Sequence, residues 1–210
     1  MPSVRAQIRS KSAWVLLLLA LTTVQACNDD GRTLREPTRT TVTVAPTSTT
    51  AMVATTAPTE FYAMAWWADG EAIPTNTGCD GDGLSPSLSW ALVPAGATAI
   101  GIVAVDSSEI LPDGSEYILW VAAGISPNAT GIPEGSIPDE AIQGMNSAGG
   151  VGWVAPCPPA GETHRIDITV FALASTDAMK SGMSGNDMRS AIIDAAIDEF
   201  TVSGSYSAPE

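Results

Sequence analysis

The pattern of hydrophobic and polar residues predicts a β-rich fold over residues 60–207. Short apolar runs alternate there with Gly, Pro, Asn and Asp, which is typical of strands joined by tight turns. Residues 97–105 are almost continuously apolar, which indicates a central strand buried on both faces, and residues 117–123 follow the same pattern. Residues 166–170 alternate between apolar and polar side chains, so this strand should have one wetter face.

One helix is predicted near the C-terminus, over residues 186–199. Ser184 or Asn186 can cap its first turn. Apolar residues then recur at helical spacing: Met188, Ala191, Ile192, Ala195 and Ala196. Residues 200–206 alternate again and predict a closing strand.

The first 26 residues are interpreted as a lipoprotein signal peptide. Residues 1–11 are basic and contain no acid, and residues 13–21 are apolar, a run too short to span a bilayer comfortably. The run leads to the sequence VQAC, which resembles a bacterial lipobox. Cys27 would then be acylated and anchor an exported protein to the extracytoplasmic face of the cell membrane. The alternative is a general secretory signal with an incidental cysteine.

Residues 27–59 are predicted to form a disordered tether. They are rich in Thr, Ser and Pro and hold few large apolar side chains, so burial cannot offset the entropy of ordering them. A flexible coil of this length reaches roughly 30 Å from its anchor.

The charge balance of the chain narrows the classes of partner that it can bind. The 210 residues contain 9 Lys and Arg against 23 Asp and Glu, a net charge of −14. Only Arg165, Lys180 and Arg189 are basic from residue 60 onward. This balance argues against nucleic acid as a partner and disfavours electrostatic docking on anionic lipid.

Residues 79–90 read CDGDGLSPSLSW. The segment DGEAIP at 69–74 precedes it, and VPAG at 93–96, PCPP at 156–159 and HR at 164–165 follow it. These segments and their order resemble the phosphatidylethanolamine-binding proteins, in their bacterial Raf-kinase-inhibitor-like branch, where the first segment reads CDGxxxSPxLSW. The resemblance implies a mainly β fold, a sandwich of antiparallel sheets with peripheral helices, and a small anion pocket at one end.

The resemblance also maps the pocket onto this chain. Asp106 and His164 keep two of its residues, whereas Leu119 stands where the family has a second pocket histidine. Asp80 and Pro156 are expected beside it. Because a phosphate-sized anion needs convergent donors and positive charge, the pocket should bind anions weakly or accept a neutral ligand.

Two functions remain open at this point. The first is a non-enzymatic module at the cell envelope that binds a small polar or phosphate-bearing ligand. The second is a protein-interaction module, similar to a kinase or protease inhibitor, with a vestigial pocket. A purely structural pairing of Asp106 with His164 is a further alternative.

Neither an enzyme nor a metal site is expected. Ser107 or Ser108 with His164 and Asp106 could be written as a catalytic triad, but no GxSxG-type elbow exists. The chain has one histidine, and the DGDG at 80–83 lacks the rest of a calcium loop. No cofactor is implied.

The two remaining cysteines are expected to form a disulfide. With Cys27 acylated, Cys79 and Cys157 form an even pair in an oxidising compartment, and both lie in family motifs near the pocket. A disulfide is therefore predicted; two reduced, buried thiols are the alternative.

Trp90 and Trp120 should lie in the core. Trp66 and Trp67 are adjacent on a predicted strand, so one should point outward.

Overall fold

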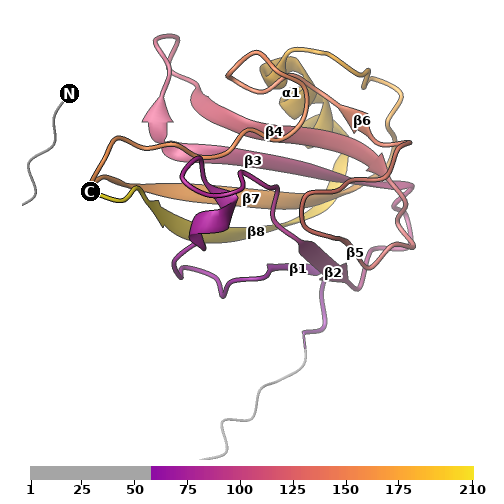
Figure 1. The fold of residues 1–210 in the computed structure, drawn as a ribbon. Helices are drawn as coiled ribbons and strands as arrows, with labels where there is room; N and C mark the ends of the chain where they lie inside the picture. Colours follow the sequence, from indigo (N-terminus) through magenta and orange to yellow (C-terminus); the bar gives the residue numbers. More distant parts are fainter. Residues whose placement is uncertain (1–57) are drawn as a thin grey trace, which may run out of the picture. The chain divides into compact units, whose positions relative to one another are not determined.

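The fold consists of two antiparallel sheets, seen in a computed structural model that describes residues 58–210 (Figure 1). The smaller sheet has the order β1 (Tyr62–Ala65), β2 (Leu88–Ala91), β5 (Gly131–Ile132). The larger has the order β6 (Ile142–Gln143), β4 (Glu116–Ile125), β3 (Ala99–Ile110), β7 (Thr163–Leu173), β8 (Ala196–Ser207). The predicted signal peptide, Cys27 and all but the end of the predicted tether lie outside the described residues.

Strand β3 is buried on both faces, as its apolar run predicts. It pairs with β4 on one side and β7 on the other, and residues 99–106 are all buried. Ile100, Ile102 and Ala104 face the core between the two sheets, whereas Val103 and Val105 belong to a second core beneath the helix. The predicted sandwich is confirmed, and Trp90 and Trp120 both lie in the core between the sheets.

The helix is shorter than the prediction. Helix α1 spans Gly185–Ala195, and Ser184 caps it by accepting a hydrogen bond from the Asp187 N–H. Ala196, Asp198 and Glu199 instead belong to β8, because each is paired with a residue of β7. Sheet pairing therefore overrides the helical spacing of the apolar residues beyond residue 195. Within residues 58–210, no helix has the length and hydropathy that a bilayer crossing requires.

The strand predicted over residues 166–170 is also confirmed. It forms the centre of β7, with Ile166, Ile168 and Val170 in the core between the sheets. The intervening residues Asp167 and Thr169 are only partly buried. Strands β3, β4, β7 and β8 all contribute residues to the end of the large sheet where the C-terminus lies (Figure 1).

Candidate ligand-binding site

The site is built around Asp106, which ends the buried part of β3. Its carboxylate is 1% exposed. Oδ1 accepts hydrogen bonds from the backbone N–H groups of Ser108 at 3.0 Å and Glu109 at 3.2 Å, where the β3–β4 register is interrupted. These bonds hold the carboxylate so that Oδ2 is directed at His164.

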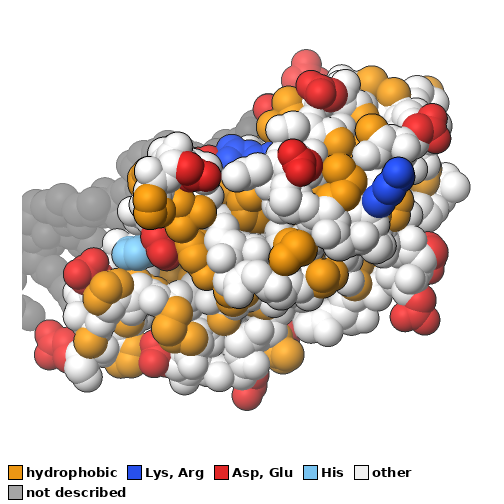
Figure 2. Space-filling view, turned by 90° about the horizontal axis from the view of Figure 1, so that it is seen from above, with side chains coloured by type: hydrophobic (Ala, Val, Ile, Leu, Met, Phe, Trp, Pro, Cys, Tyr) orange, Lys and Arg blue, Asp and Glu red, His pale blue; other side chains and the backbone are white. Residues whose placement is uncertain are grey.

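His164 meets Asp106 from the neighbouring strand. Its Nδ1 lies 2.7 Å from Asp106 Oδ2, a hydrogen-bond distance, and its side chain is 13% exposed. The Nε2 atom lies 3.8 Å from Glu162 Oε2. The pair is thus formed by tertiary structure, with one ring nitrogen held from inside and the other turned toward an exposed carboxylate. Figure 2 shows the histidine at the surface beside acidic side chains.

Two tyrosines flank this pair. Tyr117 is the β4 partner of Asp106, and Tyr206 is the β8 partner of His164. Burial raises the pKa of the Tyr117 hydroxyl, and the charges of Glu109 and Asp106 raise it further. Burial also raises the pKa of Tyr206, with Asp80 nearby. Both hydroxyls therefore stay protonated at neutral pH and can donate hydrogen bonds.

Asp80 reaches the site through Tyr206, whose hydroxyl donates a hydrogen bond to Asp80 Oδ2 at 3.3 Å. Gly78 packs on the same ring, since a Cβ added there would lie 1.9 Å from Tyr206 Cζ. Pro156 is buried next to this loop, and its carbonyl accepts a hydrogen bond from the Cys79 N–H at 3.1 Å. The loop with Asp80 thus covers the Tyr206 side of the site.

The predicted disulfide is confirmed. Cys79 and Cys157 are bonded, with their Cα atoms 5.3 Å apart. The bond joins the Asp80 loop to the segment that contains Pro156, residues that are far apart in the sequence.

Leu119 is 1% exposed and belongs to the core between the sheets. It brings no donor or charge, and it does not line the depression that borders His164. Ile166, at 1% exposure, likewise brings no hydroxyl.

The serines next to Asp106 are used structurally. Ser107 Oγ donates to the Arg165 carbonyl at 3.1 Å, and Ser108 Oγ accepts from the Arg165 N–H at 2.9 Å. Both hydroxyls therefore bond to the β7 backbone and neither bonds to His164, so the three residue types do not assemble a nucleophilic triad here.

The electrostatics of the site are acidic. Asp106, Glu109 and Glu162 surround one imidazole. Among residues 58–210, both arginines are paired with acids outside this group: the Arg165 guanidinium binds Asp167 at 2.9 Å and Arg189 binds Glu116 at 2.7 Å. A depression of about 280 Å³ borders His164 and is lined mainly by Ser, Thr and Gly residues, with Arg165 at its wall.

Sequence reasoning identified Asp106, His164 and Asp80 but missed the two tyrosines and the two glutamates. Tyr117 had a signal, because it lies two residues before Leu119 and strand side chains alternate with period two. Tyr206 had a weaker one in the alternation of the closing strand. Glu162 had a similar signal, because it lies two residues before His164. Glu109 had none, since only the approach of β3 to β7 brings it near His164.

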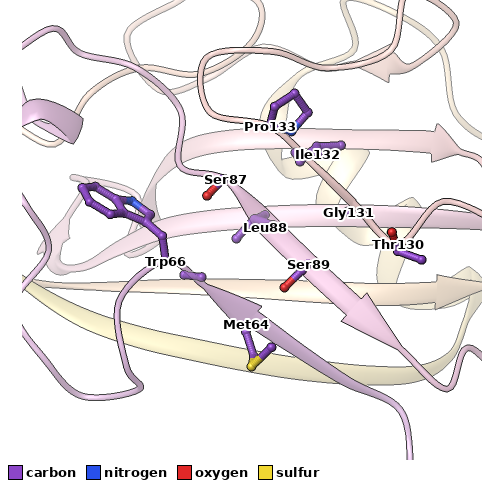
Figure 3. Close-up of a pocket in the computed structure, with 10 residues that line it drawn as sticks. Met64, Trp66, Ser87, Leu88, Ser89, Thr130, Gly131, Ile132 and Pro133 are labelled. Atoms are coloured by element: carbon purple, nitrogen blue, oxygen red, sulfur yellow. The ribbon is translucent and has the colours of Figure 1, made fainter.

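A second hollow lies on the small sheet. It has a volume of about 340 Å³, and Trp66 and Met64 lie on it with the hydroxyls of Ser87 and Ser89 (Figure 3). Trp66 is 46% exposed and Trp67 only 7%, so one of the adjacent indoles does point outward, although β1 ends at Ala65.

Comparison with known proteins agrees with this geometry. The sequence profile of the family "phosphatidylethanolamine-binding protein" matches residues 63–207. A UPF0098 protein of Methanothermobacter thermautotrophicus is 33% identical over 141 residues, covering 64% of this chain and 89% of its own. LppC of Mycobacterium tuberculosis, which bears the name of a lipoprotein, is 32% identical over 145 residues, covering 69% and 70%.

Two solved structures share the fold. One is a phosphatidylethanolamine-binding protein homologue, CT736 of Chlamydia trachomatis, with a TM-score of 0.64, 27% identity and coverage of 70% of this chain and 97% of its own. The other is YbcL of Escherichia coli, with a TM-score of 0.64, 26% identity and coverage of 70% and 98%. The chain belongs to the phosphatidylethanolamine-binding protein family.

Proposed function

We propose that this chain is an exported lipoprotein, anchored through Cys27, that binds a small polar ligand at the Asp106–His164 pair without catalysing a reaction. One observation carries the proposal: a fully buried carboxylate orients the only histidine of the chain, and the protonated hydroxyl-bearing side chain of Tyr117 is paired across the sheet with that carboxylate's residue. A few polar groups held in fixed positions are typical of small-molecule sites.

The acidic surroundings limit the ligand class. Three carboxylates near one imidazole repel a simple anion, and Leu119 supplies no compensating donor. A ligand that carries an amino group beside its phosphate, such as phosphoethanolamine, offsets part of this repulsion. We therefore expect phosphoethanolamine to bind more tightly than inorganic phosphate.

The test uses the ring signals of His164, because no other histidine contributes to the spectrum. Phosphoethanolamine, inorganic phosphate and glycerol are added to the full chain in detergent, with a chelator present and no histidine tag. We expect a saturable shift with phosphoethanolamine, a weaker one with phosphate and none with glycerol. Unmoved signals with all three would overturn the proposal.

A matched pair of variants locates the binding. Tyr117→Phe removes a hydroxyl at the site and should lower the phosphoethanolamine affinity severalfold, since one hydrogen bond is lost. Tyr62→Phe removes a hydroxyl from β1 in the other sheet and should leave it unchanged. Equal effects of the two substitutions would contradict binding at this site.

A specific observation favours the protein-interaction module as a second candidate. Met64, Trp66 and Phe200 are 52%, 46% and 38% exposed around an apolar hollow of about 610 Å³. Exposed apolar clusters of this kind mark interaction surfaces. A photo-crosslinking residue at position 66 should give a discrete adduct with an envelope protein in cells, and one at Asp139 should not. Identical adduct patterns from both positions would remove this candidate.

A further inference from the structure

Asp106, Glu109 and His164 form a cluster with metal-ligand geometry. One carboxylate oxygen from each acid and an imidazole nitrogen all lie within 4.8 Å of one another. Two of the three come from the end of β3 and the third from the start of β7. We propose that these three side chains bind a divalent transition-metal ion of the zinc class.

The donor set suits such an ion. Imidazole nitrogen and carboxylate oxygen both bind Zn²⁺ at about 2.0–2.2 Å, so two ligand atoms at tetrahedral angles lie about 3.4 Å apart. Asp106 Oδ2 and His164 Nδ1 are 2.7 Å apart in a hydrogen bond. An ion that replaces the shared proton therefore requires these two atoms to separate by only about 0.7 Å. The exposed Glu109 side chain closes the remaining gap by rotation, which costs little on a surface residue.

The surroundings of the cluster support a metal-bound ring. Two backbone N–H groups hold Asp106 Oδ1, so the other oxygen is fixed in place before an ion arrives. When Nδ1 binds the ion, the remaining proton of a neutral imidazole sits on Nε2. Glu162 Oε2 lies 3.8 Å from Nε2, and a small rotation of this exposed side chain would let it accept a hydrogen bond from the Nε2–H, the usual second partner of a metal-bound histidine.

The negative charge of the cluster also favours a divalent cation. Three carboxylates lie around one imidazole, while Arg165 and Arg189 of the described residues are paired with Asp167 and Glu116. A divalent ion offsets this excess and reverses the local sign. The site would then attract the phosphate of a ligand that it otherwise repels; this last step rests on the proposed function, whereas metal binding itself does not.

The experiment titrates Zn²⁺ into the full chain in detergent, with no histidine tag and no organic ligand. His164 is labelled with ¹⁵N and ¹³C, and calorimetry measures stoichiometry in parallel. We expect a saturable one-to-one shift with Nδ1 as the metal-bound nitrogen. No saturable shift, or a shift that assigns the ion to Nε2 with Nδ1 still protonated, overturns the proposal.

Exposed variants keep the test independent of folding. Glu109→Gln should weaken Zn²⁺ binding at least tenfold, because one charged ligand is lost, and Glu140→Gln, also exposed but on a distant loop, should not. Equal affinities of the two variants, or undiminished binding in His164→Gln, would overturn the site.

Failure here is distinguishable from failure of the proposed function. Phosphoethanolamine binding is measured with a chelator, and Zn²⁺ binding is measured without phosphoethanolamine. Once both are known, phosphate should bind at least tenfold more tightly to the Zn²⁺ form than to the metal-free form. An unchanged phosphate affinity would contradict an ion with an open coordination position.

Discussion

At the scale of single residues, the site depends on how one buried carboxylate is satisfied. Asp106 uses one oxygen for two backbone N–H groups and the other for His164, so its burial at 1% exposure does not leave an unpaired charge. The same arrangement fixes the imidazole. Leu119, two residues from Tyr117, is buried in the core and supplies no donor.

The substitution Leu119→His tests whether position 119 belongs to the proposed ligand site. An imidazole at this position adds a donor to an anion, so phosphoethanolamine affinity measured in chelator should rise about tenfold, or about 1.4 kcal/mol. Leu119→Met keeps the side chain apolar and serves as the control. Unchanged affinity in a variant whose thermal unfolding is still cooperative would count against Leu119 as part of the ligand site.

The lowered pKa of Asp167 predicts that the free energy of unfolding depends on pH. Burial alone would raise the pKa of Asp167, but hydrogen bonds from Ser203 and Arg165, with the positive charge of Arg165, outweigh it and lower the pKa below its ordinary value of 3.8. A lowered pKa stabilises the fold above that ordinary value, and the contribution is lost as pH falls through the folded pKa.

Asp167→Asn should therefore flatten the loss of stability as pH falls below about 4. Urea midpoints measured across this range check it, with Asp139→Asn at an exposed carboxyl as control. An acid limb as steep in Asp167→Asn as in the parent chain would show that Asp167 is not linked to folding.

At the scale of elements, the loop that contains Gly78 and Asp80 packs against Tyr206 near the end of β8. Gly78 lies so close to the Tyr206 ring that a Cβ would clash, and Asp80 follows it in the same loop. The Cys79–Cys157 bond and the hydrogen bond from the Cys79 N–H to Pro156 hold this loop against the second segment. The disulfide and Gly78 together position Asp80, which accepts the hydrogen bond from Tyr206.

The double variant Cys79→Ser/Cys157→Ser should lose stability. The two cysteines are 78 residues apart, and in the chain-entropy model a loop of that length contributes about 4.5 kcal/mol to the free energy of unfolding. Urea unfolding of parent and variant measures the difference. The same free energy for both would mean that the cross-link does not restrict the unfolded chain.

At the scale of the whole molecule, the net charge bears on the proposed lipid anchor. The net charge of −14 opposes direct adsorption on anionic lipid, so a covalent anchor is the physically consistent route to the membrane. Several acyl chains hold a protein far more firmly than one, at about 0.8 kcal/mol per buried methylene.

Cys27→Ala should move the protein from the membrane fraction to the soluble fraction and abolish incorporation of labelled palmitate. The Cys79→Ser/Cys157→Ser variant is the control, because it should keep the label. Palmitate incorporation that persists in Cys27→Ala would contradict acylation at this cysteine.

The sequence by itself determined the elements whose pattern is local. The apolar run of β3, the alternation in β7 and the capped start of α1 depend on neighbouring residues, and all three could be read directly. The family motifs added the disulfide and the positions of Asp106, His164 and Asp80.

Tertiary structure decided the features that depend on pairing between distant segments. Residues 196–199 extend β8 because β7 offers them partners, which no helical spacing could reveal. Tyr117, Tyr206 and Glu109 come near His164 only because strands that are distant in the sequence pair with one another. The acidic character of the site, and with it the proposed ion, follows from distances across the sheet, because charges interact according to separation in space.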